Sequence, residues 1–454
     1  MTRREPGTAV AWVGIVILSP IFGALAYFLL GVNRISRRAQ EVRGRSADAY
    51  RMLLPKACAK ADVVAALGSN HEHLTQVAVL GDVITDRPLL HGNRISLLRN
   101  GDEAYPAMIA AIDEAEHSIS LVSYIFDYDQ AGKLFCDALA RANERGVAVR
   151  ILIDDVGARY SFPPTVRRLR RDGIRSARFM PALFHWRMPY FNLRNHRKIM
   201  VIDGKTGFTG GMNIREGFWK SLSGEDHGAD LHFRVEGPVV SELQEVFAQD
   251  WTFSARERLE GDIWFPEIAP AGSTVARGIA DGPDVDFEKL QTIILGAIAA
   301  SRQSITILTP YFIPDVRMQS ALTIAAGRGV DVVIILPSRV NLVLVQWAST
   351  AYWEELLRAG CRIVVTPPPF DHGKLMLVDD AWTLFGSANL DPRSLQLNFE
   401  FNVECYDSAV AQEARRELQV RLEIGREVTL QEIRERPLRV KFRDRLARLF
   451  SAYL

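Results

Sequence analysis

NHRKIMVIDGKTGFTGGMN (195–213) and DHGKLMLVDDAWTLFGSAN (371–389) carry one pattern twice. In each stretch the second residue is a histidine, and a lysine two residues later, four apolar residues and an aspartate follow. Matching residues then follow at identical spacing. One copy of such a pattern is weak evidence, whereas two copies with matching ends indicate an internal duplication. The paired positions are His196 and His372, Lys198 and Lys374, Asp203 and Asp379, Gly210 and Gly386, Gly211 and Ser387, and Asn213 and Asn389.

The segments upstream of the two copies also match. SISLVSYIF (118–126) leads to ANERGVAVRILIDD (142–155), and SITILTPYF (304–312) leads to AAGRGVDVVIILP (325–337). Each pair predicts a strand, a helix and a second, continuously apolar strand, which is typical of a mainly parallel sheet covered on both faces. We therefore predict two similar α/β lobes related by approximate two-fold symmetry.

The remaining segments predict a division into six parts. A stretch rich in Pro, Gly and Ala, PEIAPAGSTVARGIADGPD (266–284), indicates the connection between the lobes. The predicted parts are a membrane-spanning helix (8–32), a juxtamembrane segment (33–90), a first lobe (91–262), a linker (263–284), a second lobe (285–430) and a basic amphipathic tail (431–454).

The N-terminus predicts a single membrane span. Residues 8–32 are uncharged, and about 20 apolar residues suffice to cross a bilayer. A cleaved signal peptide is the alternative, because Ala24-Leu25-Ala26 resembles a cleavage site. The apolar run continues beyond that site and stops at a cluster of arginines, which favours a retained anchor. More arginine follows the span than precedes it, which favours lobes on the cytoplasmic side of a cell's inner membrane.

Composition limits the possible partners. The net charge of +1 is too small to attract a polyanion strongly, so nucleic acid is not the predicted partner. Four widely spaced cysteines predict buried, reduced thiols. The basic stretch 163–179 is either a solvated helix face or a contact with anionic headgroups, and 185–195 is either a cleft wall or packed core. The tail is either a helix docked on the body or one lying on an anionic membrane surface.

The repeated pattern places reactive groups together. Residues two apart on a strand face the same way, so each histidine projects with its lysine. A hairpin turning on Gly204-Lys205 sets Asn213 opposite His196, and one turning on Asp380-Ala381 sets Asn389 opposite His372. Imidazole, ammonium and carboxamide together suit a phosphate group. If both hairpins face one cleft, both histidines flank a single phosphorus atom.

Carboxylates complete the predicted site. A histidine that acts as nucleophile or acid needs a carboxylate behind its other ring nitrogen, and the candidates are Asp230 and Glu400. Asp203 and Asp379 lie past the turns, where we expect them to form stabilising ion pairs. His71 and His73 have no third ligand nearby in the sequence, so they do not predict a metal site.

The duplicated His-x-Lys-x4-Asp pattern resembles the phospholipase D superfamily. Within it, RNHRKIMVIDGKTGFTGGMNI (194–214), TPYFIPD (309–315) and FGSANLDPRSLQLNFEFNVE (385–404) resemble the bacterial cardiolipin synthases. The resemblance implies two α/β lobes with mixed sheets flanked by helices. It further implies phosphatidyl transfer between two phosphatidylglycerol molecules through a phosphohistidine, without metal or cofactor. It also implies that His196 is the nucleophile and His372 the general acid. Gly211, Asn213, Ser387 and Asn389 are the implied substrate-binding residues. A phospholipase D that uses water and a nuclease of the superfamily remain alternatives, and the oligomeric state is left open.

Overall fold

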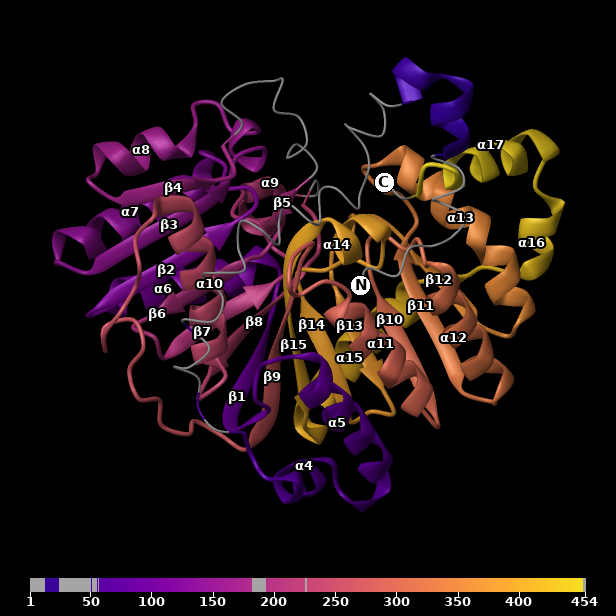
Figure 1. Ribbon diagram of the computed structural model, residues 1–454, viewed down its shortest axis with the longest axis horizontal. Helices are drawn as coiled ribbons and strands as arrows, with labels where there is room; N and C mark the ends of the chain where they lie inside the picture. Colours follow the sequence, from indigo (N-terminus) through magenta and orange to yellow (C-terminus); the bar gives the residue numbers. More distant parts are fainter. Residues whose placement is uncertain are drawn as a thin grey trace.

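The computed structural model describes residues 13–23, 50, 55, 57–181, 193–224 and 227–451. A continuous 16-stranded sheet runs through the molecule in the order β16-β12-β11-β10-β13-β14-β15-β9-β1-β8-β7-β6-β2-β3-β4, with β5 paired to β15 (Figure 1). Read outward from the β9–β1 junction, the two directions match strand for strand as far as β12 and β4, and β16 extends the second lobe beyond β12. The chain therefore forms the two similar lobes that its duplication predicts.

Matching strands of the lobes occupy matching places in the sheet. The first-lobe strands are β1 (Leu90–Arg99), β2 (Ser118–Ser123), β3 (Ala148–Asp154), β4 (Arg175–Phe179), β5 (Arg194–Asn195), β6 (Ile199–Ile202), β7 (Thr206–Gly210) and β8 (Leu231–Glu236). The second-lobe strands are β9 (Thr274–Asp281), β10 (Ser304–Leu308), β11 (Asp331–Pro337), β12 (Arg362–Thr366), β13 (Leu375–Val378), β14 (Trp382–Gly386), β15 (Asn398–Tyr406) and β16 (Arg426–Glu427).

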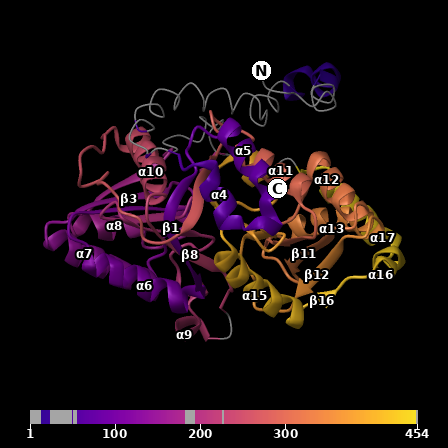
Figure 2. The same cartoon turned by 90° about the horizontal axis from the view of Figure 1, so that it is seen from below.

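Helices cover both faces of the sheet. Figure 2 shows α10 and α11 on one face and α6 and α15 on the other. The first-lobe helices are α6 (Asn100–Glu114), α7 (Gln130–Glu144), α8 (Thr165–Arg171), α9 (Lys220–Ser223) and α10 (Val240–Ala255). The second-lobe helices are α11 (Lys289–Ala300), α12 (Val316–Gly327), α13 (Val343–Arg358), α14 (Pro392–Gln396), α15 (Ser408–Ile424), α16 (Leu430–Glu435) and α17 (Leu438–Arg448).

The sheet is mixed and flanked by helices, as the resemblance implies, whereas the mainly parallel sheet predicted from the upstream segments is wrong. Parallel pairs occur in β2-β3-β4 and β10-β11-β12, where a helix crosses between strands, and in the short β15–β5 contact. The centre, from β13 to β6, is antiparallel because hairpins and neighbouring strands of the two lobes meet there. Only the outer strands form the β-α-β units that the upstream segments predict.

The predicted linker contains a strand of the sheet. Thr274–Asp281 forms β9, which pairs with β1 of the first lobe and with β15 and is buried along its whole length. Its small residues suit close packing: a methyl group on Gly278 would lie 2.6 Å from the Phe401 ring. The composition that indicated a flexible connection therefore serves packing at the junction of the lobes.

The two lobes share a hydrophobic core. One apolar cluster lies within the first lobe and another within the second, and a third combines α10 and β8 with α15 and β14. In this shared cluster Phe233 stacks on Phe385 with ring centroids 3.7 Å apart. Burial of this size across the junction makes independent movement of the lobes costly, so side chains from both lobes hold defined positions at one site.

The segment before the first lobe packs on the second. It forms α4 (Lys60–Leu67), η1 (Ser69–Leu74) and α5 (Thr75–Ile84), whose apolar side chains join the second-lobe core. Cys136, Cys361 and Cys405 are free and buried, as predicted, and Cys58 is free and half-buried.

The predicted membrane span lies mostly outside the described residues. Residues 13–23 are helical apart from a bend at Ser19. Within the part of the chain that the structure describes, no helix is both long and apolar enough to cross a bilayer. Most of the stretch 185–195 also lies outside the described residues.

Candidate active site

Each histidine begins a hairpin whose first residues pair with the opposite lobe. The hairpin β6–β7 follows His196, whose backbone N–H donates to the Phe399 carbonyl of β15 at 2.9 Å. In the second copy, His372 N–H donates to the Ala229 carbonyl at 2.7 Å. Each motif is therefore fixed against the partner lobe, one residue before that lobe's candidate carboxylate.

The carboxylates are exchanged between the lobes. His196 Nδ1 donates to Glu400 at 2.9 and 3.0 Å, and His372 Nδ1 donates to Asp230 at 2.8 Å. Both carboxylates are fully buried. The contact at Nδ1 fixes the ring orientation and leaves Nε2 to carry the lone pair or the reactive proton. The sequence predicts these two carboxylates, but not that each serves the other lobe's histidine.

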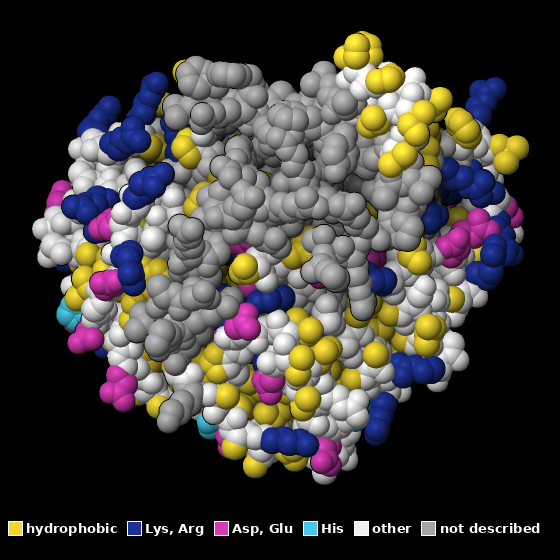
Figure 3. Space-filling view, viewed as in Figure 1, with side chains coloured by type: hydrophobic (Ala, Val, Ile, Leu, Met, Phe, Trp, Pro, Cys, Tyr) yellow, Lys and Arg dark blue, Asp and Glu magenta, His cyan; other side chains and the backbone are white. Residues whose placement is uncertain are grey.

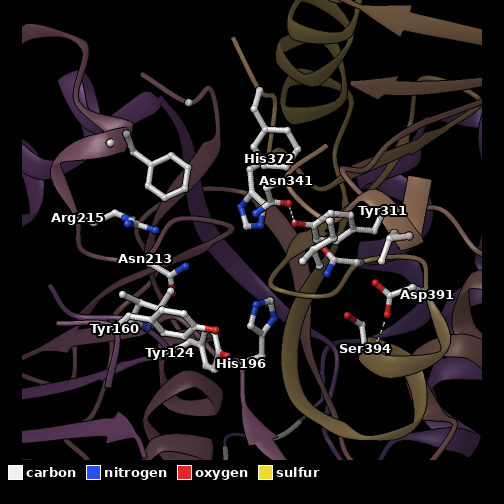
Figure 4. Close-up of a pocket in the computed structure, with 18 of the residues that line it drawn as sticks. Tyr124, Tyr160, His196, Asn213, Arg215, Tyr311, Asn341, His372, Asp391 and Ser394 are labelled. Carbon is white, nitrogen blue, oxygen red and sulfur yellow. Dashed lines mark hydrogen bonds between the residues drawn. The ribbon is translucent and has the colours of Figure 1, made fainter. Parts of the chain in front are cut away.

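Both histidines line one cavity of about 720 Å³ (Figure 4). Its wall contains residues of both lobes, including Asn213 and Asn389 of the predicted substrate-binding set. Sequence reasoning singled out none of several other lining residues, namely Tyr124, Tyr160, Arg215, Tyr311, Asn341, Asp391 and Arg393. None of them belongs to the repeated histidine, lysine and aspartate pattern, so that pattern could not indicate them. Arg194, in the stretch 185–195, also lines the cavity, as the cleft-wall interpretation of that stretch predicts.

Burial lowers the basicity of the site. It reduces the pKa of Lys198 to about 7 and that of Lys374 to about 8. Burial lowers the pKa of His196 and, together with the charge of Lys374, brings the pKa of His372 to about 4. Burial raises the pKa of Glu400, but His196 and Lys198 outweigh it and hold that pKa below its ordinary value. The site thus holds bases whose protonation a bound anion would favour.

The lysines are held beside their histidines. Lys198 Nζ donates to the His196 carbonyl at 2.6 Å, and Lys374 Nζ donates to the His372 carbonyl at 2.5 Å. Lys374 Nζ also lies 3.0 and 3.1 Å from the two ring nitrogens of His372. Two amines and two imidazoles therefore share a buried space with only two carboxylates in direct contact with the histidines, an arrangement suited to an anionic ligand.

The predicted hairpin register is wrong by one residue in both copies. Ile202 pairs with Thr206 and Val378 with Trp382, so three residues rather than two connect the strands. Asp203, Gly204, Asp379 and Asp380 adopt positive φ in these turns. Asn213 and Asn389 consequently lie beyond the paired strands, although both reach the cavity. Asn213 Oδ1 accepts from the Ile125 N–H at 3.1 Å.

Two of the predicted substrate-binding residues support the carboxylates instead. Ser387 Oγ donates to Glu400 at 2.5 Å. At Gly211, an added methyl group would lie 2.2 Å from Asp230 Oδ1. Glycine is needed there because Asp230 must reach His372. Neither Gly211 nor Ser387 is among the described residues that line the cavity.

The motif aspartates bind mainly backbone amides rather than the ion-pair partners that were predicted, although Asp379 also pairs with His73. Asp203 accepts from the N–H groups of 116–118 and Asp379 from those of 302–304, at the start of β2 and of β10. Asp379 also accepts from His73 Nε2 at 2.6 Å. Each aspartate thus connects its hairpin turn to a neighbouring strand by accepting hydrogen bonds from the backbone of that strand.

We expect Asp379→Ala to lower the free energy of unfolding by about 3 kcal/mol, because it leaves several donors without an acceptor. Asp203→Ala should lose about 1–2 kcal/mol, since Asp203 is more exposed. Urea unfolding followed by circular dichroism measures both. Asp331→Ala, at an exposed position, is the control and should change stability by less than about 0.5 kcal/mol. Equal losses at 331 and 379 would contradict the assignment.

Comparison with known proteins identifies the family. Residues 108–251 and 294–421 match the family described as "Cardiolipin synthase, PLD-like domain". The chain belongs to this family. Residues 1–31 match a second family, described as "Phospholipase_D-nuclease N-terminal". The matched cardiolipin synthase regions contain both histidines and both carboxylates.

Relatives agree with this membership, and a solved structure has a similar fold. The chain is 31% identical to a cardiolipin synthase of Geobacillus kaustophilus, over 100% of this chain and 90% of that protein. It is 29% identical to the major cardiolipin synthase ClsA of Bacillus subtilis, over 100% and 95%. The crystal structure of phosphatidylserine synthase from Haemophilus influenzae superposes with a TM-score of 0.63 at 15% identity, covering 84% of this chain and 100% of that one. That last likeness concerns the fold alone.

Proposed function

We propose that this chain is a cardiolipin synthase that transfers a phosphatidyl group from one phosphatidylglycerol to another and releases glycerol. The observation that carries the proposal is the crossed arrangement of the two histidines and two buried carboxylates on one cavity. The family membership and the relatives named cardiolipin synthase support the same reaction.

The first step forms a covalent intermediate. The neutral Nε2 of His196 attacks the lipid phosphorus, the bond from phosphorus to the glycerol oxygen breaks, and His372 gives its Nε2 proton to that oxygen. Glu400 stabilises the positive charge that develops on His196. Burial and Lys374 hold the pKa of His372 low, so the negative charge of the substrate phosphate and that of Asp230 together must raise it for His372 to act as the acid.

The second step reverses these roles. His372, now neutral, takes the proton from a hydroxyl of the second phosphatidylglycerol headgroup, whose oxygen attacks phosphorus as the bond to His196 breaks. Arg194 of the first lobe and Arg393 of the second line the same cavity, and burial, together with the charge of Arg393, lowers the pKa of Arg194. Two guanidinium groups on one cavity favour an acceptor that carries its own phosphate.

The products of phosphatidylglycerol turnover test the proposal. Purified protein is incubated with phosphatidylglycerol vesicles in ¹⁸O-labelled water, and the lipids and free glycerol are quantified. We expect cardiolipin and glycerol in equal amounts, with no ¹⁸O in the lipid phosphate. Phosphatidic acid carrying ¹⁸O, without cardiolipin, would instead make the chain a hydrolase.

We expect anion binding to take up protons at pH 8. Burial lowers the pKa of Lys198 to about 7 and that of Lys374 to about 8, so at pH 8 a fraction of each side chain is neutral. A bound phosphate favours the charged forms and raises both values, so about one proton should be taken up per chain. Titration calorimetry with inorganic phosphate, in buffers of different ionisation enthalpy, measures the uptake. The Lys198→Met variant should take up less, and a binding enthalpy independent of buffer would contradict the assignment.

We also propose that residues 8–32 anchor the chain in the inner membrane by a single span, with both lobes on the cytoplasmic side. The described part of this stretch is helical with exposed apolar side chains such as Leu18 and Ile21, and arginines follow it in the sequence. Protease treatment of sealed, right-side-out spheroplasts tests the orientation. The lobes should be protected until the membrane is permeabilised, and cleavage in intact spheroplasts would overturn the proposal.

A further inference from the structure

The C-terminal helix α17 turns its apolar side chains outward. Leu438 is 82% exposed, Phe442 70% and Leu449 76%, and Leu446 and Phe450 are also exposed. Surface helices normally bury the apolar face against the body. Figure 3 shows hydrophobic side chains at the upper right, where Figure 1 places both residues 13–23 and α17, so the apolar face of α17 is defined by the exposed fractions given above. This outward apolar face needs a partner.

The opposite face of α17 docks on α13. Asp444 and Ala447 are buried there, the Arg443 guanidinium lies 4.3 Å from the centre of the Trp347 ring, and that of Arg448 lies 4.2 Å from the centre of the Tyr352 ring. At about 100° per residue, Phe442 points away from Asp444 and Ala447. Cation–π stacking therefore holds the helix on the body through its polar face and fixes the apolar face toward the exterior.

Positive charge borders the apolar face. Arg439 and Arg445 are exposed and lie about 60° to either side of Phe442 on the helix. An apolar strip edged by arginines is the pattern of a helix that lies in the interface of an anionic bilayer. A protein partner would require no such symmetrical border of positive charge.

Exposed apolar residues also lie at the start of α13, the helix on which α17 docks. Leu342, Val343 and Leu344, where α13 begins, are all exposed, and Leu342 also lines the cavity. Trp347, on which Arg443 stacks, lies one helical turn further along α13. The docked face of α17 therefore contacts α13 one helical turn from the cavity rim of the second lobe.

The rim of the first lobe carries matching features. Tyr160 lines the cavity and is largely exposed, and nearby Phe162 is 94% exposed. The helix that follows, α8, exposes Arg167 and Arg170. Exposed apolar tips with arginines beside them thus occur on both sides of the same opening, on loops that follow the matching strands β3 and β11.

We propose that these residues form a docking face that lies on an anionic phospholipid bilayer and places the cavity mouth at the headgroups. The docking face comprises Tyr160, Phe162, Leu342, Val343, Leu344, Leu438, Phe442, Leu446, Leu449 and Phe450, with Arg167, Arg170, Arg439 and Arg445 at its edges. The inference rests on the proposed function only in taking a phospholipid as substrate. It adds a second membrane contact, independent of residues 8–32, through which lipid enters the cavity from the bilayer plane.

Turnover of bilayer and dispersed lipid by the full chain in nanodiscs tests the docking face. The nanodiscs contain phosphatidylcholine and phosphatidylglycerol, and the dispersed substrate is a short-chain phosphatidylglycerol below its micelle concentration. For Phe442→Asp/Leu449→Asp we expect the ratio of bilayer to dispersed turnover to fall about tenfold or more. The matched control, Val79→Asp/Val83→Asp, places the same charges on exposed residues of α5, which lies away from α17 in Figure 1. It should keep the wild-type ratio.

Fluorescence quenching tests the contact without relying on turnover. Nanodiscs that contain brominated phosphatidylcholine and phosphatidylglycerol are used, and the fluorescence of the unsubstituted chain, which has eight tryptophans, is subtracted. The fluorescence that Phe442→Trp adds should be quenched, and the fluorescence that Val83→Trp adds should not. Equal quenching of the two would overturn the proposal, as would quenching at 442 that persists without anionic lipid. A docking variant that loses both kinds of turnover equally, or that dissociates an oligomer in detergent, would also overturn it. A wild-type chain without turnover but with quenching at 442 would contradict the proposed function alone.

Discussion

His196→Asn should reduce cardiolipin formation by about 10⁴-fold or more, because the variant lacks the nitrogen that carries the phosphatidyl group. His372→Asn should cause a loss of similar size, since neither glycerol release nor acceptor activation then has a proton carrier. Asparagine keeps a polar side chain at each buried position, so the fold should be retained. Lipid products from phosphatidylglycerol vesicles, with circular dichroism of each variant, measure the effect.

The control for this prediction is His71→Asn. His71 belongs to η1 and contacts the Leu67 carbonyl, outside the cavity lining. Its variant should form cardiolipin at a rate close to that of the unsubstituted chain. Activity of His196→Asn above about one-tenth of that rate would contradict a nucleophilic role.

Glu400→Gln should lower the rate of transfer by about 10²–10⁴-fold, because the amide cannot stabilise a positive charge on His196. Asp230→Asn should act in the same way on His372. Because each carboxylate lies behind the other lobe's histidine, the defects should follow that crossed pairing. Both substitutions act on the first step. Glu400→Gln should impair the attack by His196, which gains positive charge, and Asp230→Asn should impair the proton donation by His372.

A leaving group that needs no acid separates the two effects. With a p-nitrophenyl ester of phosphatidic acid, formation of the intermediate should recover in Asp230→Asn and stay slow in Glu400→Gln. Glu242→Gln is a matched control: Glu242 is a buried glutamate near the lobe junction that accepts from the Gly278 N–H at 2.5 Å. Burial raises its pKa to about 8, so glutamine resembles its protonated form. Recovery in Glu400→Gln instead would contradict the crossed pairing.

The duplicated motif predicted the two-lobe fold because each copy repeats a whole structural unit. The same matching spacing also predicted that His196 and His372 share one cavity. The centre of the sheet was not predicted, since β9 and β1 pair across the lobe junction and neither strand carries a local signal of its partner. Thr274–Asp281 resembled a linker because close packing there requires small residues.

Details of the site depended on tertiary contacts that no local pattern encodes. Asp230 and Glu400 were predicted from their chemistry, but the exchange between lobes follows from the pairing of His196 with β15 and of His372 with Ala229. The register error arose because positive φ at Asp203 and Asp379 allows a three-residue connection. The sequence likewise did not decide which face of α17 lies outward, since either face of that helix could have docked on the body.

Burst kinetics with the p-nitrophenyl ester test the central claim, that one histidine carries the phosphatidyl group and the other moves the proton. The His372→Asn variant is mixed with the ester, nitrophenolate is followed in the first turnover, and the protein is then digested and analysed by mass spectrometry. We predict a burst of one nitrophenolate per chain, a stalled second step, and phosphatidyl bound to His196. A burst from His196→Asn and none from His372→Asn, or cardiolipin formation without any covalent adduct, would contradict the account.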